Sequence, residues 1–320
     1  MRTLHFIYSG NPLNDKASHP PEAIANKIYR RFEHDFNIKY YDWTYSGPFE
    51  VHEDDIVLGH PHWGADTIMR RIFMESRPLA KYLIFPFHTA MPEINYPFND
   101  LVMSCDKYFA ITGEYWYNTI VDTKFANWLP KMVRLDNAID INQFPFKRIV
   151  FHDPGERVLF YIGRDGKEKG IKELAEVIKN SGYKLYMAGL FSNESRAYFD
   201  GLDVSFLGVI HLQDSIQWII NHCDVFINMS VSDANPTTIL EMAAIGMPVL
   251  ATPQSGYSNS RLLNYLSLTD MKWNMRMLRD YQFADSSCLH KIANIARKEA
   301  DEYTWSRFLD PIEKELEKWA

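Results

Sequence analysis

Short apolar runs of strand type alternate with stretches of helical spacing along most of this chain. The apolar runs lie at residues 4–8, 56–59, 82–85, 108–111, 158–162, 185–188, 204–207, 225–228 and 249–251. Strands that alternate with helices form parallel sheets whose right-handed crossovers cover both faces. The sequence therefore predicts an α/β protein with Rossmann-like, doubly wound parallel sheets.

The chain has 320 residues, which is more than one hydrophobic core usually holds. Residues 145–155 contain prolines, a glycine and several charges, a composition typical of a connection between compact units. We therefore expect one domain over residues 1–147, a second over residues 148–302, and a closing amphipathic helix over residues 303–320. Phe308, Ile312 and Leu316 form the apolar stripe of that helix.

The overall charge argues against a nucleic-acid partner. The formal net charge is -7, and an acidic protein repels a phosphate backbone unless a basic face is segregated. The three cysteines lie far apart and indicate reduced thiols. The sequence shows neither an export signal nor an apolar run long enough to span a membrane. We expect a cytoplasmic protein, and the basic residues Arg70, Arg71, Arg77 and Lys81 permit peripheral contact with the inner face of an anionic membrane.

Residues 225–256 are expected to form a strand, loop, helix, turn and strand in succession. Asn235 is a good N-cap, and Pro236 suits the first helical position. Gly246 can take the left-handed conformation that ends helices, and Pro248 prevents continuation. The pattern predicts a helix over residues 236–245.

The first turn of that helix is a candidate phosphate site. The amides of Thr237, Thr238 and Ile239 carry the positive end of the helix dipole and can bind an anion. Glu241 lies four residues after Thr237, so both share a face, and its carboxylate can accept hydrogen bonds from ribose hydroxyls. The alternative is a capped core helix with a solvated glutamate.

The loop after the strand at residues 158–162 contains two cations among glycines. Gly163, Arg164, Gly166, Lys169 and Gly170 precede a helix. Arg164 and Lys169 could stabilise the charge of a departing diphosphate. The alternative is a charged surface turn. The spacing matches neither a Walker loop nor the dinucleotide G-x-G-x-x-G pattern.

Together these segments resemble the donor half of family-four retaining GT-B glycosyltransferases, the glycosyl transferases of group 1. The family shows a G-R-x(n)-K-G loop, then E-x7-E, then G-x-P-V. The matching positions here are Gly163-Arg164 with Lys169-Gly170, Asp233 with Glu241, and Gly246 to Val249. Residues 134–144, 204–210 and 303–308 resemble the family's interdomain segment, nucleobase-side strand and terminal helix. The resemblance covers most of residues 134–320.

The resemblance implies two facing Rossmann-like domains, with the terminal helix crossing back to pack on the first, acceptor-side domain. It assigns the donor diphosphate to Arg164 and Lys169, and the ribose to Glu241. The base would contact the backbone around Val209 and His211, and Asp233 would address the sugar hydroxyls. Gly10 would approach the phosphates, and His88 would face the donor sugar from a strand-exit loop.

Two positions depart from the family's pattern. Asp233 stands where the family usually has glutamate, so its shorter arm is expected to move the sugar, to change which sugar fits, or to accompany lost activity. Gly10 lacks the glycine-rich partner often found after the first strand.

The histidines and tryptophans of the first half offer further candidates. His60 and His62 follow a strand, where ligands of parallel sheets gather, and could bind the acceptor. A metal site at His60, His62 and His88 is an alternative, although no carboxylate lies at ligand spacing. We expect no bound metal or cofactor. Trp63 and Trp116 could stack on a sugar or pack in a core.

The resemblance implies transfer of a hexosyl unit from a UDP- or GDP-sugar, with retention, to a hydroxyl of a glycan, lipid-linked or protein-linked acceptor. Two alternatives stay open. One is a sugar-nucleotide epimerase, phosphorylase or hydrolase of the same architecture, with Asp233 and Glu241 as its acid and base. The other is a non-catalytic subunit that binds a nucleotide sugar.

Overall fold

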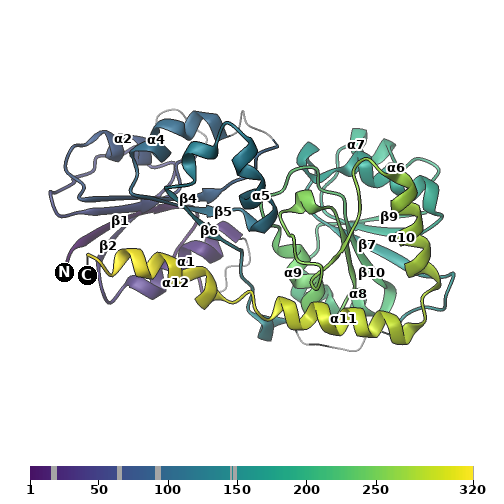
Figure 1. Ribbon diagram of the computed structural model, residues 1–320. Coiled ribbons are helices and arrows are strands. Elements are labelled where there is room, and N and C mark those ends of the chain that lie inside the picture. The colour runs from purple at the N-terminus through teal and green to yellow at the C-terminus, as the bar shows by residue number, and fades with distance from the viewer. Residues whose placement is uncertain (16–19, 63–66, 91–94, 145, 147–149, 320) are drawn as a thin grey trace. The chain divides into compact units, whose positions relative to one another are not determined.

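The protein forms two compact units, each built around a parallel six-stranded sheet (Figure 1). This computed structural model describes residues 1–15, 20–62, 67–90, 95–144, 146 and 150–319. The first unit consists of Met1–Asp136 and Trp305–Ala320, and the second of Asn137–Thr304. The observed architecture confirms the predicted α/β fold with two doubly wound sheets.

The first unit has the strand order β2-β1-β3-β4-β5-β6. Its strands are β1 (Thr3–Tyr8), β2 (Asn37–Asp42), β3 (Ile56–Gly59), β4 (Ala80–Pro86), β5 (Lys107–Ile111) and β6 (Met132–Leu135). Its helices are α1 (Pro20–Phe32), α2 (Ile68–Met74), α4 (Asn99–Ser104), α5 (Gly113–Thr119) and α12 (Trp305–Leu316). The predicted apolar stripe of α12 is confirmed, because Phe308, Ile312 and Leu316 are fully buried.

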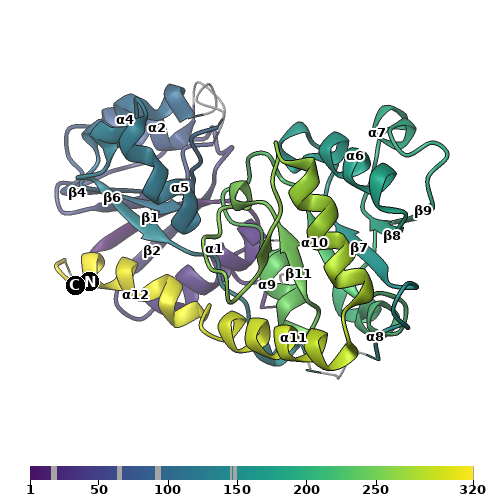
Figure 2. The ribbon, with the colours of Figure 1, turned by 45° about the vertical axis from the view of Figure 1, so that its right-hand side comes forward.

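Helix α12 packs beside α1, although the two lie at opposite ends of the sequence (Figures 1 and 2). Arg31 of α1 and Glu313 of α12 form an ion pair with a nitrogen–oxygen distance of 2.5 Å. Tyr82 of β4 accepts a hydrogen bond from Trp319 Nε1 at 2.7 Å. The last residues of the chain therefore complete the first unit.

The second unit has the strand order β12-β11-β10-β7-β8-β9. Its strands are β7 (Val158–Ile162), β8 (Lys184–Ala188), β9 (Val204–Gly208), β10 (Val225–Asn228), β11 (Val249–Ala251) and β12 (Asn264–Tyr265). Its helices are α6 (Ile171–Ser181), α7 (Asn193–Ala197), α8 (Leu212–His222), α9 (Thr237–Ala244), α10 (Met271–Phe283) and α11 (Ser286–Ala300). Helices α6 and α10 pack together, as do α9 and α11 (Figure 2).

The division between the units falls at Asp136, before the expected boundary at residue 147. The reason is packing: Ile139 and Phe144 are buried in the core of the second unit. The expected connection at residues 145–155 includes residues 145 and 147–149, which lie outside the described residues. The second boundary falls between Thr304 and Trp305.

Candidate functional site

The strand order of the second unit creates a switch point between β7 and β10. From β7 the chain proceeds outward through β8 to β9, and then returns to the other side of β7 to form β10, β11 and β12. In open parallel sheets, ligands bind beyond the carboxyl ends of the strands where the order reverses. The two loops that leave β7 and β10 here are those that contain Arg164 to Lys169 and Asp233.

Gly170 brings these two loops into backbone contact. Its φ is 65°, in the left-handed region, and a Cβ added to it would lie 1.9 Å from the carbonyl oxygen of Met229, just after β10. No side chain fits at that distance, so this position requires glycine for conformation and for space. The approach fixes the start of α6 against the end of β10.

Further hydrogen bonds join the loops beside Gly170. The carbonyl of Glu168 accepts the amide of Val231 at 3.0 Å and that of Ser232 at 3.1 Å. Glu168 lies within the 3-10 helix Lys167–Lys169. The loop after β7 is therefore held to the loop after β10 through its backbone.

The two cations predicted for the site differ in environment. Lys169 forms an ion pair with Asp233, and both side chains are largely buried, with 15% and 14% exposure. Arg164 pairs with Glu168 at 2.7 Å, but its side chain is 75% exposed. An exposed pair contributes little stability, so Arg164 can turn toward a ligand at small cost. The structure thus brings Lys169 and Asp233 together at the switch point, with Arg164 at its rim.

Helix α9 begins one residue later than predicted, at Thr237, and Pro236 takes the N-cap position. The prediction that Asn235 is the N-cap is wrong, because its Oδ1 accepts the amide of Asn137 at 2.6 Å. The amide of Ile239 is directed to the carbonyl of Pro236 at 3.4 Å. Thr237 and Thr238 thus supply the amides best placed for an anion. Gly246 has a φ of 88°, as predicted for the helix end.

Glu241 is half-buried on α9 and shares a face with Thr237, as predicted from their spacing. Burial raises the pKa of its carboxyl to about 7, while a hydrogen bond with Thr237 acts in the opposite direction. A carboxyl with this pKa changes its charge near neutral pH. Raised carboxyl pKa values of this kind are common at functional sites, where burial removes the group from water before a ligand binds.

Val209 and His211 lie beyond β9, at the far side of β8 from β7. Val209 is 66% exposed, and His211 is the exposed N-cap residue of α8. Both residues are therefore exposed near the carboxyl edge of the same sheet.

Gly163 directly follows β7, and its amide donates to the carbonyl of Ala188 at 3.0 Å.

The remaining predicted site residues belong to the first unit. Gly10 follows β1, and its amide donates to Asp42 Oδ2 at 3.4 Å. His88 follows β4, and its ring lies 6.0 Å from that of Trp116. Trp116 is buried, which agrees with a packing role, whereas Trp63 lies outside the described residues.

His60 and His62 lie after β3, next to β1, at the switch point of the first sheet. His60 Nδ1 accepts the amide of His62 at 2.9 Å, and burial lowers the pKa of His60 to about 3. The ring of Trp43 lies 4.9 Å from His60 and 4.8 Å from His62. Aromatic rings therefore gather around His60. Within the described part of the chain, no group of three or more His, Cys, Asp or Glu is placed to hold a metal ion.

Three of the four basic residues named for membrane contact bind protein atoms, and the fourth, Arg77, is exposed. Arg70 pairs with Asp100, Arg71 Nη2 donates to the carbonyl of Tyr45 at 3.0 Å, and Lys81 Nζ donates to that of Phe73 at 3.0 Å. No helix among the described residues has the length and hydropathy needed to cross a membrane.

Two features of the site lack a signal in the sequence. Tyr161 on β7 is buried beneath the loop, and a Cβ added to Gly163 would lie 2.6 Å from its hydroxyl. Nearby charges, with Asp233 the strongest, add to burial in raising the pKa of Tyr161. Asn137 pairs with Asn235 through two hydrogen bonds. Tyr161 and Asn137 lie within the ranges 158–162 and 134–144 singled out above, but no local sequence pattern indicates these partners.

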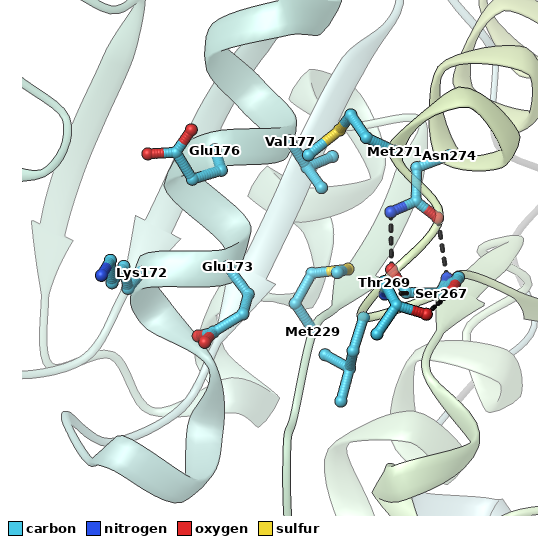
Figure 3. Close-up of a pocket in the computed structure, with 10 residues that line it drawn as sticks. Lys172, Glu173, Glu176, Val177, Met229, Ser267, Thr269, Met271 and Asn274 are labelled. Carbon is cyan, nitrogen blue, oxygen red and sulfur yellow. Dashed lines mark hydrogen bonds between the residues drawn. The ribbon is translucent and has the colours of Figure 1, made fainter.

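A separate pocket of about 260 Å³ lies beside α6 and the start of α10 (Figure 3). Glu173, Met229 and Thr269 are among its lining residues, and Asn274 is held there by two hydrogen bonds with Ser267. The lining includes neither Arg164, Lys169, Asp233 nor Glu241. The pocket therefore contains none of these four residues, but it adjoins the switch point through Met229, which approaches Gly170.

A protein-family model matches much of the second unit. Residues 142–260 match the family described as Glycosyl transferases group 1. The match contains Arg164, Lys169, Asp233 and Glu241. No curated protein sequence matches the chain.

Solved glycosyltransferases share the fold at low sequence identity. Sucrose-phosphate synthase from Thermosynechococcus elongatus has a TM-score of 0.73 and 11% identity, with 99% of each chain covered. The lipopolysaccharide outer core galactosyltransferase WaaB has a TM-score of 0.68 and 14% identity, with 99% of this chain and 100% of that chain covered. A UDP-forming trehalose-phosphate synthase from Burkholderia xenovorans has a TM-score of 0.64 and 12% identity, with 83% of this chain and 74% of that chain covered.

These likenesses span both units, whereas the family match lies in the second unit and contains the residues of its switch point. The family match, with the shared fold, identifies the chain as a glycosyltransferase of the GT-B architecture that resembles the group 1 enzymes.

Proposed function

We propose that the chain transfers a hexosyl unit from a UDP- or GDP-sugar to a hydroxyl of a glycan, lipid-linked or protein-linked acceptor, with retention of configuration. The observation that carries the proposal is the placement of Lys169, Asp233 and the first turn of α9 at one switch point. The UDP-forming activity named for a structural relative supports a nucleoside diphosphate sugar as donor.

In this proposal, each part of the donor is bound by residues of matching chemistry. Arg164 and Lys169 bind the diphosphate together with the amides of Thr237 and Thr238. Glu241 accepts hydrogen bonds from the ribose hydroxyls, and the backbone at Val209 and His211 contacts the base. Asp233 binds sugar hydroxyls once Lys169 turns to the phosphates.

The transfer proceeds by attack on the same face from which the diphosphate departs. The bond between the sugar C1 and the phosphate oxygen breaks, and a bond from C1 to the acceptor oxygen forms. The departing phosphate oxygen takes the acceptor proton, and Arg164 and Lys169 stabilise its remaining charge. Because these two cations supply that stabilisation, the reaction requires no metal ion.

A panel of UDP-, GDP- and ADP-sugars tests the proposal. One class is expected to raise the melting temperature measurably, since ligand that binds only the native state stabilises it. Turnover of that donor with a hydroxyl acceptor should continue in EDTA. Absence of binding by all three classes contradicts the proposed donor, and binding without turnover on any acceptor contradicts the proposed transfer.

The pKa of Glu241 predicts a pH dependence of donor affinity. A carboxyl with a pKa of about 7 is mostly protonated at pH 6 and mostly ionised at pH 8. Ribose hydroxyls donate to the ionised form, so binding of the preferred sugar nucleotide should be about tenfold weaker at pH 6 than at pH 8. Isothermal titration calorimetry at the two pH values measures this affinity. Sugar nucleotides suit the experiment because their phosphodiester groups do not titrate in this range.

The Glu241→Gln variant supplies the control. It should bind the donor more weakly than wild type at pH 8 and lose the pH dependence. The folded pKa of Glu241 lies above its ordinary value, so wild type without ligand should lose stability relative to this variant as pH rises through 7. Glu176→Gln, which alters an exposed carboxyl on α6, should behave as wild type. A pH dependence that persists in Glu241→Gln would contradict the assignment.

A further inference from the structure

The chain passes between the two units twice, at Asp136–Asn137 and at Thr304–Trp305. The second-unit ends of these connections are joined, because the amide of Ile139 donates to the carbonyl of Tyr303 at 3.0 Å. A movement of either connection therefore strains this hydrogen bond and displaces the other connection.

The first connection is bonded to the loop that carries Asp233. The amide of Asn137 donates to Asn235 Oδ1 at 2.6 Å, and Asn137 Nδ2 donates to the carbonyl of Asn235 at 2.5 Å. Asn235 is only 2% exposed. Asn137 is the donor in both hydrogen bonds, one to the side chain and one to the backbone of Asn235. Two bonds between the same residues fix both their distance and their orientation, and the loss of these bonds inside the protein is costly.

The second connection reaches the next residue of the same loop. The ring of Tyr303 packs edge-on against Tyr257, with centroids 5.9 Å apart. The Tyr257 hydroxyl donates to the carbonyl of Pro236 at 3.0 Å, directly before α9. Both tyrosines are buried. Asn235 thus binds the first connection directly, and Pro236 is linked to the second through Tyr257, at the point where α9 presents its first amides.

We propose that Asn137 and Tyr257 are positioning residues that couple the donor loop, residues 233–236, to the two connections between the units. A ligand that orders this loop then also orders the hydrogen bond between Ile139 and Tyr303. The coupling lies within the second unit and rests on the proposed function only in taking a nucleoside diphosphate as the ligand of the loop.

Hydrogen exchange with and without UDP tests the coupling in the full chain. In wild type, saturating UDP should slow amide exchange at the first turn of α9 and also in the peptide 137–144, which contains Ile139. We expect the second effect to be about fivefold or more, the lower end of usual coupling between sites. In the double variant Asn137→Ala, Tyr257→Phe, UDP should still slow exchange at α9 but no longer at 137–144.

The possible outcomes separate this proposal from the proposed function. Failure of UDP to protect α9 in wild type would contradict the donor site itself. Protection of α9 without protection of 137–144 in wild type would overturn the coupling, and wild-type behaviour of the double variant would overturn the role of its two residues. The single variants serve if the double variant does not fold. Asn142→Ala and Tyr198→Phe, both at exposed positions, are the matched controls and should retain the coupling.

Discussion

Replacing Lys169 by Ala is expected to lower donor turnover by about 10²- to 10³-fold. Lys169 is largely buried at the switch point and forms an ion pair with the carboxylate of Asp233. In the proposed transfer, its loss removes charge stabilisation from the departing diphosphate, and it leaves Asp233 without this cation. Steady-state kinetics measure the loss of turnover. The affinity for UDP should also fall.

Lys167→Ala is the matched control, because Lys167 belongs to the same 3-10 helix but is exposed. It should alter turnover by less than about twofold. A second variant, Lys169→Ala with Asp233→Asn, should recover thermal stability but not turnover, since it removes the negative charge that faced Lys169 without restoring the cation. Wild-type turnover in Lys169→Ala would refute the phosphate role of this residue.

The second large effect is expected at Gly170. A Cβ there would lie 1.9 Å from the carbonyl oxygen of Met229, and its backbone is left-handed. Gly170→Ala should lower the free energy of unfolding by about 1–2 kcal/mol for the conformation and by about 1–3 kcal/mol more for the displaced backbone. Chemical denaturation measures the sum. Donor affinity should fall too, because the two loops separate.

Gly182→Ala separates the two contributions. Gly182 has a similar φ of 70°, but an added Cβ would meet no atom within 4 Å. This variant should therefore show only the conformational cost, with unchanged donor affinity. Equal destabilisation by the two variants would show that the approach of Gly170 to Met229 is not constrained.

Most of the strands predicted from apolar runs are buried, although β9, an edge strand with no buried residue, was also predicted. The predicted runs include β7 and β10, whose residues are nearly all buried and form continuous apolar stretches. The missed strands, β2, β6 and β12, all lie at sheet edges. In β2 and β12 no residue is fully buried. An edge strand covered on fewer sides needs no apolar run, so its sequence carries little signal.

The candidate site shows the same division between local and tertiary information. The sequence by itself determined the α/β class, the two cation positions, and the helix that places Thr237 and Glu241 on one face, because these depend on residues close along the chain. Only the tertiary structure placed β7 beside β10 and thereby joined Lys169 to Asp233. It also gave Asn235 a partner, Asn137, in place of the predicted cap. Such contacts arise between residues far apart in sequence, where packing of the whole unit, rather than local preference, selects the partner.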